Sequence, residues 1–374
     1  MVNKKRLVKL TQELIRINSE NPPGDESRIA RYVEVYLKEL GLWPRICEFK
    51  KNRPNVLVTL EGRDTKHSLL ITPHLDTVPA GISWNIDPFS ARIKNKRIYG
   101  LGATDCKANL ACALEAINSL IEDGEVLNYN LVFAATADEE TGSDFGLIPL
   151  LDKRILKPDL AVILDSDDFD IIVTQKGLMH LKVKILGKRA HGAYPWRGLN
   201  AIDIAINIIK EIKKRKFSYK KDKLLRPPTI NVGTIKGGDK VNIVADWCEF
   251  ELDFRFLPGM SARDLLKELK RAIRKYSRRY KIEIQGIQQP YQISQTHSLV
   301  GHLKKAAQNF KISSTVKGSE GATVITFFQH KNIPAVATGF GSGGCAHMAD
   351  EFVKIDNLYK GAKFLEEFLK NYKF

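Results

Sequence analysis

Apolar residues recur along this chain in two alternating patterns. Some segments space them at helical intervals, and others hold short unbroken apolar runs that are typical of buried parallel strands. The helical segments before residue 178 are 4–17, 26–40 and 107–123, and the strand segments are 55–60, 68–72, 131–135 and 160–164. Alternating helices and strands predict an α/β domain with a central sheet.

A different order of elements begins near Met179. The predicted elements are a strand at 180–186, a helix at 200–216, strands at 229–235 and 241–256, a helix at 261–277 and a strand at 281–287. This β-α-β-β-α-β order is that of the ferredoxin-like unit. The first pattern then resumes, with helices at 299–309, 322–329 and 356–370 and a strand at 335–338. We therefore expect one domain from residues 1–177 and 289–374, and an inserted domain at 178–288.

The bulk composition is that of a globular protein. No apolar stretch reaches the roughly 20 residues that span a bilayer, and the N-terminus lacks the features of a secretory signal, so we expect a cytoplasmic protein without a membrane partner. The five cysteines form no CxxC pair, which argues against a disulfide framework. Cys112 and Cys248 are expected to be buried, and the role of Cys106 is left open.

The net charge of +16 admits two interpretations. It is either the mark of a nucleic-acid partner or the result of a lysine-rich composition on solvated helix faces. The basic runs carry few interleaved aromatic residues and match no RNA- or DNA-binding signature. We therefore expect no nucleic acid as the main partner, and keep a basic nucleic-acid-binding or non-catalytic protein as a remote alternative.

Candidate chemistry lies in acidic and histidine residues that follow apolar runs or Gly-rich turns. These are His74, Asp76, Asp105, Glu139, Glu140, Asp165 and His347. Strand ends are where α/β proteins place reactive groups, and adjacent carboxylates there are usually relieved by a cation. Two imidazoles, several carboxylates and one spare base are the components of a two-metal hydrolytic centre.

Several of these candidate metal ligands also have other interpretations. Each short segment taken alone also fits a helix cap or a solvated acidic loop. Asp167 and Asp168 compete with Asp165 as the acid after the strand at 160–164. Glu351, four residues after His347, is a candidate to support that histidine.

These segments resemble, nearly end to end, the zinc-dependent carboxypeptidase, acetylornithine deacetylase and succinyl-diaminopimelate desuccinylase family of co-catalytic metallohydrolases. The motifs that carry the resemblance are LIRINSENPPGDE, HLDTVP, GLGATDCKAN, ADEETGS, KRAHGAYPWRGLNAI, VNIVAD, FELDFRFLP and AHMADE. The resemblance implies a zinc-peptidase-like α/β catalytic domain with a mixed central sheet, and an inserted ferredoxin-like lid that mediates dimerisation.

The resemblance also implies roles by position. His74 and Asp165 hold one ion, Glu140 and His347 hold the other, Asp105 bridges them, Glu139 is the general base and Asp76 orients His74. His191 of a second subunit stabilises the oxyanion, and Asn242, Arg255 and Gly321 contact the substrate. The bond between Asp105 and Cys106 is expected to be cis. Glu320 departs from the family's Gly-rich pattern and leaves specificity open, either against acidic or in favour of basic side chains.

The function that follows is hydrolysis of an amide bond in an N-acyl amino acid. A carboxypeptidase or dipeptidase acting on short peptides is the alternative. The expected cofactors are two divalent ions, with zinc favoured and cobalt or manganese also compatible, and the expected assembly is a homodimer.

Overall fold

The chain divides into two compact units in a computed structural model that describes all 374 residues. The first unit comprises Met1–Val173, Ile293–Lys317 and Phe327–Phe374, and the second comprises Thr174–Gln292 and Gly318–Thr326. The predicted insertion thus lies within the second unit, which also takes in the short segment around Gly321.

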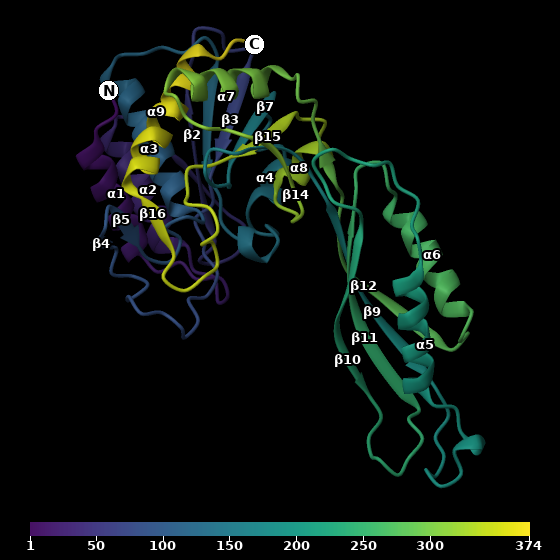
Figure 1. Cartoon of the computed structure of the whole chain (residues 1–374). Coiled ribbons are helices and arrows are strands. Elements are labelled where there is room, and N and C mark those ends of the chain that lie inside the picture. The colour runs from purple at the N-terminus through teal and green to yellow at the C-terminus, as the bar shows by residue number, and fades with distance from the viewer. The chain divides into compact units, whose positions relative to one another are not determined.

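A mixed sheet forms the centre of the first unit (Figure 1). Its strands, in spatial order, are β1 (Arg45–Glu48), β2 (Pro54–Leu60), β6 (Asn130–Ala135), β3 (Ser68–Thr72), β7 (Leu160–Leu164), β15 (Ala335–Thr338) and β8 (Ile171–Gln175). The neighbours β6, β3, β7 and β15 run parallel. All residues of β7 and β15 are buried, as expected for strands covered on both faces. The predicted α/β architecture is confirmed.

Six helices belong to this unit: α1 (Lys4–Arg16), α2 (Ser27–Glu39), α3 (Lys107–Glu122), α4 (Leu147–Asp152), α7 (Ser298–Asn309) and α9 (Ile355–Asn371). Helix α3 contacts α1 and α9, and α9 contacts α7 (Figure 1). The alanines of α3 are fully buried, because small side chains allow its neighbours to approach closely. None of the helices has both the length and the apolar character that a bilayer crossing requires.

The sequence patterns did not predict several short elements. Strands β4 (Arg92–Lys94), β5 (Arg97–Tyr99) and β16 (Phe352–Lys354) form a separate small sheet, and β14 (Val316–Ser319) pairs with β8. The helix predicted at 322–329 is wrong at its start, since α8 covers Ile325–Gln329 only. Thr323 is instead bound to Gln175, whose side chain donates to its carbonyl and accepts from its backbone N–H, each at 3.1 Å.

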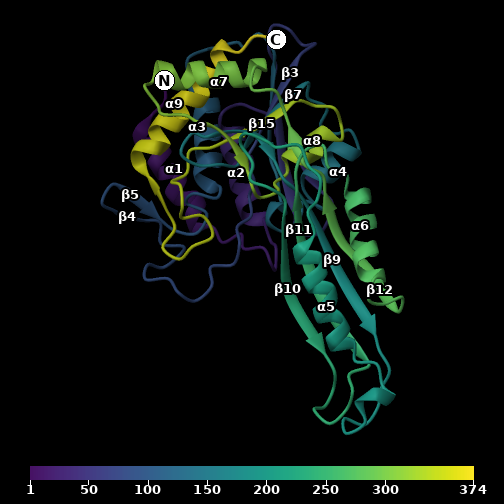
Figure 2. The same ribbon diagram turned by 45° about the vertical axis from the view of Figure 1, so that its right-hand side comes forward.

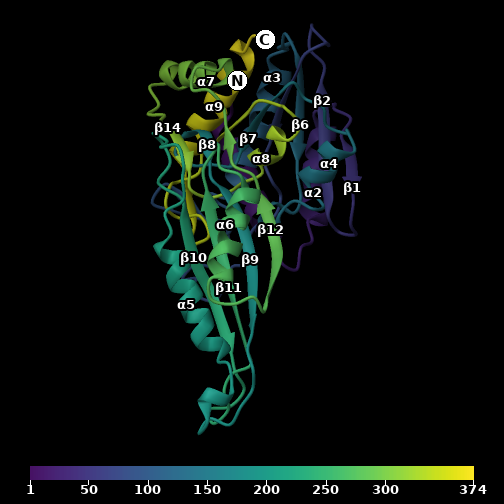
Figure 3. The same ribbon diagram turned by 90° about the vertical axis from the view of Figure 1, so that its right-hand side faces the viewer.

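The second unit contains a four-stranded antiparallel sheet in the order β10-β11-β9-β12. Its elements along the chain are β9 (Gly177–Leu186), α5 (Ala201–Lys214), β10 (Thr229–Gly237), β11 (Trp247–Phe256), α6 (Ala262–Arg274) and β12 (Tyr280–Gln288). Helices α5 and α6 lie over the same face of the sheet (Figures 2 and 3). The predicted β-α-β-β-α-β order is confirmed, and β13 (Tyr291–Gln292) pairs with the end of β8.

Alternating burial on β9 and β11 builds the core of this unit. Every second side chain, including Val183, Phe250 and Phe254, packs beneath α5 and α6, and the intervening side chains face away. The strand predicted from residue 241 begins only at Trp247. Residues before it pair with another loop, since the N–H of Val244 donates to the carbonyl of Ala190 at 2.9 Å.

Candidate metal centre

Side chains from five separate segments of the first unit meet at one edge of its sheet. His74 follows β3, Glu139 and Glu140 follow β6, and Asp165 follows β7. These three strands are parallel neighbours, so their carboxyl ends lie together. Asp105 lies just before α3, and His347 comes from the loop after β15.

The carboxylate of Asp105 lies between two imidazoles. Its Oδ1 is 2.9 Å from Nε2 of His74, and its Oδ2 is 3.2 Å from Nε2 of His347. Each oxygen therefore faces a different ring nitrogen. A carboxylate in this position has the geometry of a ligand shared between two cations.

The remaining acids divide between the two imidazoles. Potential ligand atoms of His74, Glu139 and Asp165 lie within 4.8 Å of one another, and those of Asp105, Glu140 and His347 form a second such group. Asp165 belongs to the first group, whereas Asp167 belongs to neither. The structure thus brings together every residue for which a metal or general-base role was predicted.

The two adjacent glutamates are the first two residues of a short 3₁₀ turn, Glu139–Thr141. It begins after Asp138, whose φ of 68° lies in the left-handed region. Asp76 holds this turn: its carboxylate accepts the N–H of Glu139 at 3.0 Å and the N–H of Glu140 at 3.1 Å. Consecutive residues are in this way directed to different metal groups.

The orientation of His74 differs in detail from the prediction. Its Nδ1 lies 3.0 Å from the backbone carbonyl of Asp76 and 3.5 Å from the carboxylate of the same residue. Donation from Nδ1 to the carbonyl leaves Nε2 free to bind a cation. Asp76 thus orients His74 through its backbone and positions the glutamate turn through its side chain.

Glu351 does not support His347, as its sequence position had suggested. Its buried carboxylate accepts three backbone N–H groups, from Gly102 at 3.0 Å, Thr104 at 2.6 Å and Asp105 at 2.9 Å. It therefore fixes the loop that carries Asp105. Sequence spacing pointed to the wrong partner because the contact joins residues about 250 positions apart.

A buried polar network behind the site was also missed. Asn21 donates to Asp76 at 2.8 Å, and Arg53 bridges Glu26 at 2.6 Å and Asp138 at 2.8 Å. Asn21 lies in the NPPGDE segment of the first quoted motif, which was the available signal. Arg53 carried none.

The electrostatics show an excess of buried carboxylates. Burial and the nearby Asp105 carboxylate raise the pKa of Asp165 to about 7, and burial together with Asp165 raises the pKa of Glu139 well above its usual range. Hydrogen bonds to Asp105 and Glu140 raise the pKa of His347 to about 10. Crowding of buried carboxylates raises their pKa values in this way, and bound cations relieve such crowding. Imidazole and carboxylate donors in this number fit two divalent cations such as zinc.

The peptide bond between Asp105 and Cys106 is cis, as expected. The Cys106 thiol is buried beside His74, accepting its N–H at 3.2 Å and lying 3.4 Å from its carbonyl oxygen. Burial raises the pKa of Cys106 to about 12, so the thiol is not a nucleophile at neutral pH. All five cysteines are free and buried.

The predicted substrate contacts lie in the second unit. His191 is exposed and accepts the N–H of Ala193 at 3.0 Å, and the guanidinium of Arg255 forms two hydrogen bonds with Asp253, at 2.7 and 3.0 Å. Asn242 and Gly321 are exposed. The roles of these four residues stay predictions.

Glu320 does not present a free carboxylate for substrate selection. It contacts the buried ammonium of Lys176 at 2.5 Å and accepts the N–H of Arg226 at 2.8 Å. These contacts explain why the pKa of Glu320 is lowered despite some burial. The charge of Glu320 is therefore already paired with Lys176, and an effect of this residue on specificity stays a prediction.

Fold and site together define a metal-dependent hydrolase. The profile of Peptidase family M20/M25/M40 matches residues 70–371, and the chain belongs to this family. It is a metallohydrolase that acts on C–N bonds.

Relatives of similar length extend this comparison. The chain is 30% identical to an uncharacterized metallohydrolase of Methanocaldococcus jannaschii, with 97% of this chain and 98% of the relative aligned. It is 29% identical to acetylornithine deacetylase of Vibrio parahaemolyticus, over 91% and 90% of the two chains. A metallo-carboxypeptidase of the M20 family from Sulfolobus solfataricus superimposes with a TM-score of 0.82 and 26% identity, covering 98% of this chain and 99% of that one.

Proposed function

We propose that this protein is a two-metal amidohydrolase that releases the acyl group from N-acyl amino acids. The observation that carries the proposal is Asp105, whose two oxygens face the imidazoles of His74 and His347. Similarity to acetylornithine deacetylases over nine-tenths of the chain supports the substrate class.

In this proposal each side chain has one task. His74 and Asp165 would hold one cation, Glu140 and His347 the other, and Asp105 both. Two divalent cations supply Lewis acidity, which acidifies a water molecule and polarises the carbonyl of the scissile amide. Glu139 accepts the proton of the attacking water and returns it to the leaving nitrogen.

The second unit is assigned the role of a lid and dimerisation domain at residues 178–288. His191 from a second subunit would donate to the oxyanion, and Asn242, Arg255 and Gly321 would bind the substrate's carboxylate end. For Arg255 this requires that the guanidinium be shared with Asp253, its present partner.

Replacing Glu139 by Gln tests the base assignment. The amide cannot accept a proton, so we expect kcat to fall at least 100-fold while two metal ions per chain remain bound. Asp167→Asn is the matched control, because this nearby acid lies in neither metal group. Wild-type turnover in metal-loaded Glu139→Gln protein would contradict the assignment.

Peptide hydrolysis is the second candidate, favoured by the similarity to the Sulfolobus metallo-carboxypeptidase. A screen of N-acetyl and N-succinyl amino acids beside dipeptides would separate the two activities. The screen should use enzyme that has been stripped with a chelator and reloaded with zinc, cobalt or manganese. Higher kcat/KM on peptides than on every acyl amino acid would reject the deacylase assignment.

A further inference from the structure

The positive charge of this protein belongs almost entirely to one of its two units. The second unit holds 27 of the 59 lysines and arginines but only 12 of the 43 acids, so it carries +15 of the net +16. The first unit, which contains the metal centre, is left with +1. A general bias of composition towards lysine would charge both units, so the asymmetry needs another explanation.

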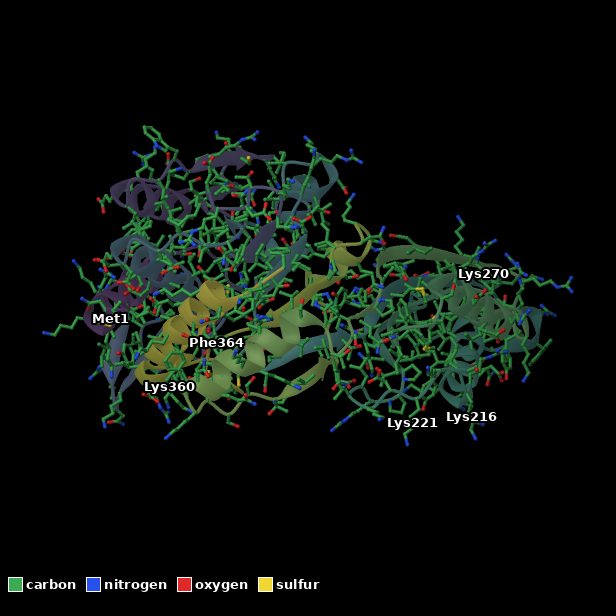
Figure 4. All side chains as sticks on the ribbon, turned by 90° about the horizontal axis from the view of Figure 1, so that it is seen from above. Met1, Lys216, Lys221, Lys270, Lys360 and Phe364 are labelled. Atoms are coloured by element: carbon green, nitrogen blue, oxygen red, sulfur yellow. The ribbon has the colours of Figure 1, made fainter.

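Much of this charge follows helix α6 and its continuation into β12. Residues 261–281 include nine lysines and arginines and two acids. Both acids are already paired, Asp264 with Lys267 and Glu268 with Arg215 and Arg271. Figure 4 shows Lys270 apart from Lys216 and Lys221, so basic side chains occupy more than one side of the unit.

A groove of about 720 Å³ runs between α6 and the edge strand β12. Lys270, Arg274 and Arg278 line it at intervals of four residues, and none of them makes an ion pair. Leu266 and Ile282 contribute apolar surface. Tyr280 also lines the groove, and its hydroxyl accepts from Nε of Arg274 at 3.0 Å.

We propose that this groove binds single-stranded nucleic acid, without reading its sequence. Lys270 and Arg274 lie one turn apart on α6 and Arg278 follows the helix end, so three cations without ion pairs line the groove in succession, which suits a chain of phosphates. Guanidinium groups bind phosphate through paired N–H donors. The accessible part of the Tyr280 ring, which packs partly against the core, and the exposed side chain of Ile284 offer a surface against which a base can lie. The proposal thus adds nucleic acid as a partner, although the few aromatic residues in the basic runs had argued against it.

Other anionic partners match the groove less well. A membrane surface is broad, whereas the three cations line a concavity. A second copy placed on this groove would bring the cations Lys270, Arg274 and Arg278 of two chains together, so the dimer proposed above would form through another face of the second unit. An acidic protein would leave the stacking surface without a function, since carboxylates do not stack.

The test is binding of a dye-labelled RNA of about 20 nucleotides, followed by fluorescence anisotropy between about 50 and 200 mM salt. Replacing Lys270, Arg274 and Arg278 together by Glu should weaken binding at least tenfold at low salt. The slope of log K against log salt should fall by about 2, since each phosphate contact in a single strand contributes about 0.7.

The matched control replaces Lys94, Lys304 and Lys305 of the first unit by Glu, which changes the net charge equally. It should lose less than threefold in affinity. If the groove variant fails to fold by circular dichroism, the corresponding triple Gln variant takes its place, with the same expectation for the slope.

Three results would overturn the proposal. They are the absence of RNA binding at about 50 mM salt, equal losses in the groove and control variants, and tighter binding to polyglutamate or to phosphatidylserine vesicles than to RNA. The assay does not depend on catalysis, so its outcome is separate from that of the proposed hydrolase function.

Discussion

Replacing Glu351 by Gln removes a negative charge that holds the loop bearing Asp105. The carboxylate accepts three N–H groups, with Thr104 and Asp105 sharing Oε1 and Gly102 bound to Oε2. Gln keeps one acceptor oxygen and turns its amide donor towards the third N–H. Losing one charged hydrogen bond at about 1.5–3 kcal/mol, and weakening two others, should lower the free energy of unfolding by about 2–4 kcal/mol.

The same loop carries Asp105, the ligand proposed to be shared by the two cations, so we also expect a loss of metal affinity of about 10- to 100-fold. Urea unfolding of the metal-free protein and zinc competition with a chelating indicator measure the two effects. Both measurements are made at pH 8, because burial raises the pKa of Glu351 to about 7 and the wild-type carboxylate must be ionised.

Glu115→Gln is the matched control for this experiment. Glu115 is also fully buried and accepts from the backbone of Asn3 and twice from Arg6, at distances of 2.6 to 2.9 Å. It should lose similar stability and keep its metal affinity. Zinc affinity of Glu351→Gln within twofold of wild type would refute the positioning role.

Two further variants test the surroundings of the site. Burial raises the pKa of Glu26 from 4.5 to about 7. Its contribution to stability is therefore complete below pH 4.5 and is lost as the pH rises through 7. Between pH 4.5 and 8 the free energy of unfolding should fall by as much as about 3 kcal/mol from this group. Glu26→Gln should flatten that decline in urea unfolding, and an unchanged pH profile would show the assignment wrong. In Gly339→Ala the new Cβ would lie 1.8 Å from the carbonyl oxygen of Ser166, the residue after Asp165. We expect the free energy of unfolding to fall by about 1–3 kcal/mol and elemental analysis to find fewer than two bound metal ions. The control Gly301→Ala has open space around the new Cβ and should leave stability unchanged or raise it. Two bound metal ions in Gly339→Ala would count against the argument.

Long periodic segments were predictable because burial alone selects their pattern. The helices α1 and α3 and the strands β6 and β7 lie within a residue of their expected bounds. The three-residue strands β4, β5 and β16 were not predictable. So short a segment has no measurable period, and its pairing partner lies elsewhere in the chain.

The site shows the same division. Residue types, strand ends and a Gly-rich turn indicated His74, Asp105, Glu139, Glu140 and His347, because metal ligands are few in kind and such turns and strand ends are where reactive groups are placed. Those features did not choose between Asp165 and Asp167. That choice depended on which carboxylate lies near the His74 imidazole.

The sequence alone was enough to predict an α/β architecture with an inserted antiparallel unit and a set of candidate metal-binding side chains, since periodicity and residue chemistry are local properties. The tertiary structure alone decided that Glu351 holds the Asp105 loop, that Glu320 is compensated by Lys176, and that three cations share one groove. Hydrogen bonds and charge pairs depend on distances of a few ångströms between residues far apart in the chain, and only the folded chain sets those distances.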